Sequence, residues 1–313
     1  MIINKIKTVS VVVAALVVLS GCGGSSDDPA GNVVTPLPTL SVPVAEATVE
    51  NATEAVKTVF EAEGVSTVGT TGLLAAGSTQ TSGFDSVKFA LNALETIQET
   101  NSGVYALNEA ISDSQACTGG GNITVSGTVT QTAATVTMVT NNCVEDGVTL
   151  NGTIGATLTL SSAGQVSYAK LTFETDYTVT DTVSSKIHQG SYMELSLNSP
   201  TAGTSTSSLW FESLGQHMRY DDLKINFTED GFGNGTQCYK NGRIYINNLT
   251  SYMDIDSSYD PNCLTPFTTS GHVLTSGSTR LLGSNGLTVH VEVTGPNTLL
   301  ATDQNGNTLS STN

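Results

Sequence analysis

Apolar and hydroxyl-bearing residues alternate along much of the chain after Cys117, and this alternation constrains the fold more than any other feature. The segment 122–129 reads NITVSGTV, with an apolar or small residue at every second position. Successive side chains of a strand point to opposite faces, so the pattern predicts strands with one buried face. It recurs at 135–139, 148–160, 166–173, 192–197 and 287–293.

Turn-forming dipeptides accompany these segments: Asp146-Gly147, Asn151-Gly152, Asp230-Gly231, Asn234-Gly235, Asn285-Gly286 and Asn305-Gly306. Asn, Asp and Gly tolerate the backbone angles that tight turns require. No helical pattern of ten residues lies between the strands, which argues against parallel βαβ units. We therefore predict a mainly antiparallel β domain over residues 116–313, either a sandwich or an open barrel.

Residues 45–115 show a different periodicity. Apolar residues spaced by three and four occur first between Ala45 and Ala62 and again between Val87 and Ile97, where a capping-box pattern precedes them. This spacing is typical of amphipathic helices, and Val104, Leu107 and Ile111 continue it. We expect two or three helices here, so the predicted fold class is α+β, with N-terminal helices followed by the β domain.

The first residues are typical of an export signal. Lys5 and Lys7 precede an apolar run from Val9 to Leu19, which is shorter than the roughly 20 residues that a membrane span needs. The run ends in Leu19-Ser20-Gly21-Cys22, which resembles the lipobox of bacterial lipoproteins. That resemblance implies removal of the signal peptide 1–21 and acylation of Cys22. Since Gly23 rather than Asp follows the cysteine, it also implies the outer membrane.

Residues 22–44 are rich in Gly, Ser and Asp and then in Pro, so we expect a flexible tether. The formal net charge of the chain is −17, which argues against nucleic acid or anionic lipid as a partner because both would be repelled. The expected partners are the membrane, through the lipid anchor, and an envelope protein or glycan.

Four cysteines remain after Cys22, and an even set in an exported chain predicts disulfides. The nine residues from Cys117 align without gaps on those from Cys238, and Asn-Cys recurs at Cys143 and Cys263. We infer two related β units, 117–176 and 238–295, with local disulfides Cys117–Cys143 and Cys238–Cys263; the alternative is a coincidental likeness. No CxxC spacing occurs, so we do not expect a cysteine-ligated metal.

One acidic segment offers oxygen ligands at every second position, as a calcium loop does: Asp254, Asp256, Ser258 and Asp260. However, Tyr259 stands where an EF-hand requires Gly. Calcium is thus the one candidate cofactor, and a solvated acidic loop is the alternative. No other cofactor is expected.

Aromatic residues crowd the region from Trp210 to Phe267, and the candidate binding residues are Trp210, Tyr220, Tyr245 and Tyr252. Such side chains on a polar β face could stack on sugar rings or anchor a protein partner. The alternative is core packing and cross-strand pairing.

Motifs of catalysis are missing from the sequence: it has no GxSxG, HExxH, P-loop or GxGxxG pattern. His217 beside Asp221 and Asp222 could form a dyad, with exposed loop charges as the alternative. Three functions follow: a non-catalytic structural or interaction role, binding of a small apolar ligand or glycan in a β cleft, and a hydrolase whose site no motif reveals. In composition and strand pattern the chain resembles the uncharacterised Thr/Gly-rich, β-rich envelope lipoproteins of Gram-negative bacteria.

Overall fold

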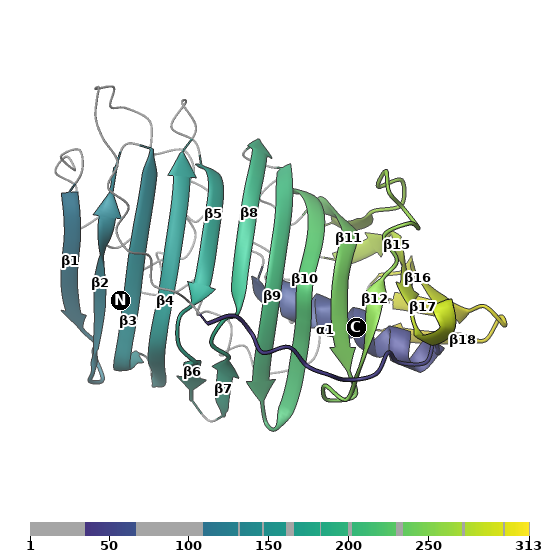
Figure 1. The fold of residues 1–313 in the computed structure, drawn as a ribbon, viewed down its shortest axis with the longest axis horizontal. Helices are drawn as coiled ribbons and strands as arrows, with labels where there is room; N and C mark the ends of the chain where they lie inside the picture. Colours follow the sequence, from purple (N-terminus) through teal and green to yellow (C-terminus); the bar gives the residue numbers. More distant parts are fainter. Residues whose placement is uncertain are drawn as a thin grey trace.

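In the described part of the chain, eighteen strands form a single antiparallel sheet that dominates the fold (Figure 1). The computed structural model describes residues 35–66, 109–130, 132–145, 147–160, 166–181, 183–199, 202–229, 234–270, 273–296 and 298–312. Every ladder between the strands is antiparallel, as the alternation predicts. The strands are β1 (Glu109–Ala116), β2 (Asn122–Val129), β3 (Ala133–Glu145), β4 (Val148–Leu160), β5 (Val166–Phe173), β6 (Tyr177–Thr180), β7 (Ser184–Ile187), β8 (Tyr192–Ser199), β9 (Ala202–Ser213), β10 (Gln216–Glu229), β11 (Gly235–Ile246), β12 (Ser251–Ile255), β13 (Phe267–Ser270), β14 (Val273–Ser276), β15 (Ser278–Leu282), β16 (Thr288–Gly295), β17 (Thr298–Asp303) and β18 (Thr308–Thr312).

The described residues contain one α-helix, α1 (Val49–Ser66), instead of the two or three that the sequence predicts. The second predicted helix, around 87–97, lies outside the described residues. Residues 109–115, the end of the predicted helical segment, lie in strand β1, which pairs with β2 along its whole length. Ile111 is the only large apolar residue of this stretch, which is too little for a helix to bury a face, so pairing with β2 decides its conformation. No helix in the described ranges combines the length and the apolarity of a membrane span.

The sheet divides and rejoins twice in the same way. The first half of β4 pairs with β6 and its second half with β5, and both branches meet again at β9 through β7 and β8. In the second case the first residues of β11 pair with β13 and its last residues pair with β12. These branches return to β16, which pairs with β15 and lies beside β14. The sequence repeats at each point of division, as Asn151-Gly152-Thr153-Ile154 in β4 and Asn241-Gly242-Arg243-Ile244 in β11.

Two sequence predictions are corrected by this topology. Asn151-Gly152 is not a turn, because Gly152 (φ +140°) continues strand β4 at the point where its partner changes. The predicted units 117–176 and 238–295 do not coincide with the structural repeat, which relates β4–β9 to β11–β16. The two disulfides also occupy different places: Cys117 precedes β2 and Cys143 lies in β3, whereas Cys238 lies in β11 and Cys263 follows β12. A short alignment anchored on Cys and Gly therefore matched unlike strands.

Helix α1 covers one face of the sheet, against β10–β12 and β16–β18. Its apolar stripe, including Val49, Ala52 and Val56, is buried, as the spacing predicts. Beneath it, Val56 and Val59 meet the inward side chains of Ile244 and Leu281. The enclosed space there is only about 10 Å³, which is room for at most one water molecule. The core under α1 is therefore filled.

Residues 35–44, which we call the strap, lie against the sheet although the sequence predicts a flexible tether there. The backbone of residues 35–37 touches Gly190, in the loop between β7 and β8. At the other end Val44 forms a parallel bridge with Tyr252, and the N–H of Ala45 donates to the Tyr252 carbonyl at 2.7 Å. Figure 1 shows the strap as the dark purple line that crosses the view of β9 and β10, nearer to the viewer than the fainter α1. These contacts fix the end of the tether that adjoins the domain.

Candidate functional site

The disulfide pairing predicted from the sequence is confirmed. Cys117 joins Cys143 and Cys238 joins Cys263, with Cα–Cα distances of 5.4 and 5.7 Å. Each bond closes a local loop, of 26 and 25 residues. Cys22 lies outside the described residues, so its acylation stays a prediction.

The candidate calcium ligands do not converge on a common point. Asp254 accepts from the Arg243 guanidinium at 3.0 Å, and Asp256 accepts from Arg280 at 2.7 Å. Asp256 also accepts from the hydroxyl and the backbone N–H of Ser258. Partial burial alone would raise the pKa of Asp256, but the hydrogen bonds from Ser258 and Arg280 outweigh it and lower that pKa. These two carboxylates are therefore engaged by separate arginines.

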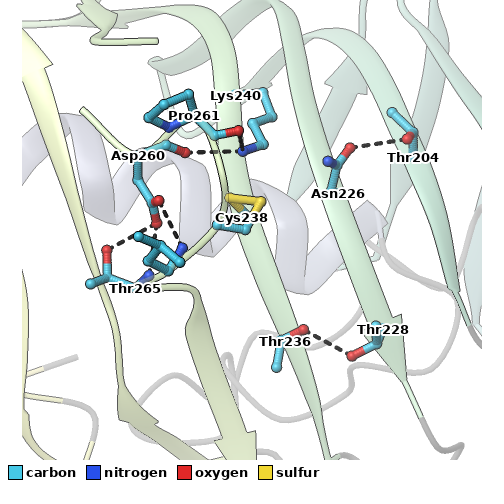
Figure 2. The surroundings of a disulfide bond; sticks show 11 residues. Thr204, Asn226, Thr228, Thr236, Cys238, Lys240, Asp260, Pro261 and Thr265 are labelled. Atoms are coloured by element: carbon cyan, nitrogen blue, oxygen red, sulfur yellow. Dashed lines mark hydrogen bonds between the residues drawn. A yellow bond between two sulfur atoms is a disulfide. The ribbon is translucent and has the colours of Figure 1, made fainter. Parts of the chain in front are cut away.

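Asp260 stabilises the loop that carries Cys263 (Figure 2). Its carboxylate accepts from the backbone N–H groups of Leu264 and Thr265 at 2.7 Å each, and from the Thr265 hydroxyl. Lys240 of β11 donates to the carbonyls of Asp260 and Pro261 at 3.0 and 2.9 Å. The acidic segment thus holds its own backbone beside the disulfide, and the structure does not bring its four candidate oxygens together.

Three of the four candidate aromatic residues share one cross-strand row. Trp210 of β9 pairs with Arg219 of β10, Arg219 with Tyr245 of β11, and Tyr245 with Tyr252 of β12. The guanidinium of Arg219 lies 5.4 Å from the Trp210 ring and 5.0 Å from the Tyr245 ring. Tyr220, the fourth candidate, is buried in the core instead, because it is adjacent to Arg219 on the strand and points to the opposite face.

Arg219 holds this row together from a buried position, with 1% of its surface exposed. It donates two hydrogen bonds to Asp221, at 2.8 and 2.9 Å, and the Tyr245 hydroxyl donates to the same carboxylate at 2.8 Å. Burial first, and then the Asp221 carboxylate, raise the pKa of Tyr245 to about 12. Since Tyr245 is buried too, only Trp210 and Tyr252 of the row are half-exposed. The row is chiefly a structural network, so the packing alternative describes it better than a stacking surface.

A second cluster adjoins Trp210 and was not predicted from the sequence. His188 follows β7, Glu212 lies in β9 and His217 lies in β10; one ligand atom from each lies within 4.8 Å of the other two. His217 does not pair with Asp221 or Asp222, because Asp221 binds Arg219 and Asp222 binds Tyr192. Nothing in the sequence indicates His188, which only the pairing of β7 with β9 brings beside Glu212.

The His188 imidazole is enclosed by the cluster. It stacks on the Trp210 ring with centroids 3.8 Å apart and planes 18° apart. Its Nε2 lies 3.2 Å from Glu212 Oε2, and its Nδ1 lies 3.9 Å from Asp176 Oδ1. Burial, assisted by the charge of Lys186, lowers the pKa of His188 in spite of the two carboxylates. The lowered pKa favours the neutral form of the ring.

An open groove of about 540 Å³ borders the cluster. It lies at the β6–β7 and β9–β10 hairpins and is lined by Thr178, Val183, Ser184, Lys186, Glu212, Leu214 and Gly215. Lys186 and Glu212 form an ion pair across 3.2 Å, and Lys186 lowers the pKa of Glu212. Leu214, at the tip of the β9–β10 hairpin, is 66% exposed. The groove thus offers hydroxyls, a paired cation and anion, and exposed apolar surface.

Comparison of the chain with protein-family models, with curated proteins and with solved structures finds no match.

Proposed function

We propose that this chain is an exported protein, anchored to the outer membrane by acylated Cys22, that serves a non-catalytic interaction role in the cell envelope. The lipobox-like Leu19-Ser20-Gly21-Cys22 supports the anchor. The segment between Cys22 and the strap gives the β domain a link to the membrane. Two native disulfides in the β domain suit an oxidising compartment outside the cytoplasm.

The groove at the β6–β7 and β9–β10 hairpins carries the binding part of the proposal. Thr178, Ser184 and the Lys186–Glu212 pair supply hydrogen-bond donors and acceptors from strands β6, β7 and β9. Leu214 supplies apolar surface beside them. Sugar rings present hydroxyls at their edges and C–H groups on their faces, so this lining suits a glycan of the envelope.

An enclosed apolar ligand fits the structure less well. Such a ligand needs a cavity of hundreds of Å³, whereas the apolar space under α1 measures about 10 Å³. The open, mixed lining of the groove favours a hydroxyl-rich ligand over an apolar one.

Metabolic labelling with radioactive palmitate tests the anchor. The parent chain should incorporate label and fractionate with outer membranes, and Cys22→Ala should lose both properties. The two disulfides use other cysteines, so the variant should keep its fold. Label in the variant, or none in the parent, would exclude acylation at Cys22.

A hydrolase is the second candidate, and one observation favours it: His188 and Glu212, both with a lowered pKa, lie with His217 at the rim of the groove. Perturbed titratable groups in a cleft are frequent at catalytic sites. Turnover of nitrophenyl esters by the parent chain, abolished in Glu212→Gln, would replace the non-catalytic proposal.

A further inference from the structure

We propose that His188, Glu212 and His217 form a binding site for a divalent transition-metal ion of the zinc class. The three side chains come from neighbouring strands or the residue directly after one, and their ligand atoms lie within 4.8 Å of one another. Two imidazoles and one carboxylate are a donor set that zinc uses with an open fourth position. Ligand atoms around tetrahedral zinc lie about 3.4 Å apart, given bonds of about 2.0–2.1 Å. Small side-chain rotations would therefore close the site. This proposal is independent of glycan binding.

His188 presents an unpartnered nitrogen to the cluster. Its Nε2 is buried and has no hydrogen-bond partner, although Glu212 Oε2 lies 3.2 Å away. A buried polar atom without a partner is costly, and a metal ion would satisfy it. On the other side of the ring Nδ1 faces Asp176. A carboxylate behind a metal-binding histidine orients the ring and selects its tautomer. Asp176 is itself held by the backbone N–H of Gln189, which donates to it at 2.8 Å.

Trp210 is hydrogen-bonded to the second histidine of the cluster, His217. Its indole N–H donates to Nδ1 of His217 at 3.2 Å, and an indole nitrogen can only donate. A metal bound at Nδ1 would take the lone pair that the indole uses. A metal bound at Nε2 would require the proton on Nδ1, which would turn that atom into a donor. Metal binding at either nitrogen must therefore break the Trp210–His217 hydrogen bond.

Lys186 is the competing cation of the site. Its Nζ lies 3.2 Å from Glu212 and 3.6 Å from Asp176. A divalent ion bound to Glu212 would displace this ammonium group from the carboxylate. Removing the charge of Lys186 should consequently strengthen metal binding, which a merely structural role of the cluster would not predict.

Glu212, a ligand of the proposed metal, and Lys186, its competing cation, also line the groove.

Zinc titration of the full chain, purified in detergent and freed of metal with a chelator, tests the proposal. Calorimetry should show one saturable site of micromolar or tighter affinity. The emission of Trp210, the only tryptophan of the chain, should change with the same midpoint. His188→Ala, His217→Ala and Glu212→Gln should each weaken zinc binding at least about tenfold. Lys186→Met should strengthen it severalfold.

His290→Ala is the matched control, since His290 also lies near a glutamate, at 3.7 Å from Glu292, but on β16. It should bind zinc as the parent does. Glu212→Gln keeps the shape of the side chain, so it tests the site if an alanine variant fails to fold. The absence of saturable binding to the parent, or unchanged affinity in Glu212→Gln and His217→Ala, would overturn the proposal.

Discussion

The indole of Trp210 in β9 donates a hydrogen bond to Nδ1 of His217 in β10, across 3.2 Å. On its face the same indole stacks against His188 at 3.8 Å. The only tryptophan of the chain is thus in contact with two imidazoles at the rim of the groove. Trp210 thus contacts both the cross-strand row that contains Arg219 and the cluster of His188, Glu212 and His217. Its fluorescence can therefore report changes in either group.

Protonation of His188 should quench Trp210 with a midpoint below pH 6.5. Burial and Lys186 lower the pKa of this imidazole, while Asp176 and Glu212 oppose the shift only in part. Because the unfolded chain binds this proton at higher pH than the folded chain, the free energy of unfolding should fall as the pH drops from 6.5 through the folded pKa. A pH titration of the emission of the parent, compared with that of His188→Asn, measures the midpoint. A midpoint above 6.5 would contradict the burial argument.

Asp221→Ala should destabilise the protein more than Arg219→Met. The first change leaves the buried guanidinium of Arg219 without its carboxylate, which costs about 3 kcal/mol. The second removes the buried charge and retains a side chain of similar length. Urea unfolding of both variants and of the double variant gives the coupling energy. If the free energy of unfolding falls equally in the two single variants, the buried guanidinium of Arg219 does not depend on Asp221 as its partner.

Replacing either cystine by two serines should lower the free energy of unfolding by about 3.5 kcal/mol, the chain-entropy value for a loop of about 26 residues. The two losses should be similar, because the loops differ by one residue. Urea unfolding of the two serine variants measures both losses. Peptide mapping without reduction checks the pairing in the parent, and a peptide that joins Cys117 to Cys238 would disprove it.

Gly190→Ala should release the strap. Gly190 has a positive φ of 86°, and an added Cβ would meet the backbone of residues 35–37. Gly147→Ala is the control, since Gly147 has φ 84° and open space around it. Both should lose about 1–2 kcal/mol to backbone strain, but only the first should expose the strap to limited proteolysis. Equal cleavage in the two variants would mean that the strap is not held at Gly190.

The strands were predictable because their signal is local. At 122–129 and 288–293, alternation of apolar with polar residues indicates the buried face directly. The disulfide pairing was predicted correctly although the alignment behind it matched unlike strands, because each cysteine has its partner 25 or 26 residues away in the chain. The strand conformation of residues 109–115 was not predictable, because it depends on pairing with β2 rather than on the residues of β1 themselves.

The cluster could not be read from the sequence for a related reason. His188 and Glu212 are separated by 24 residues, and they meet only because the short hairpin β6–β7 inserts between β4 and β9. Likewise, alternation places Tyr245 on the polar face, but it does not tell that Arg219 is buried beside it. Which residues meet across strands depends on register, and no hairpin turn sets the register of β7 against β9, because these two strands are not consecutive in the chain.

Calorimetric titration of the full chain with soluble oligosaccharides of the envelope, peptidoglycan fragments and the core oligosaccharide of lipopolysaccharide, tests the proposed binding function most directly. We predict saturable binding of at least one of them that Ser184→Trp abolishes, because Ser184 lies in the groove. Ser310→Trp, at an exposed serine of β18, should bind as the parent does. No binding by the parent, or equal binding by Ser184→Trp and Ser310→Trp, would contradict a glycan site in this groove.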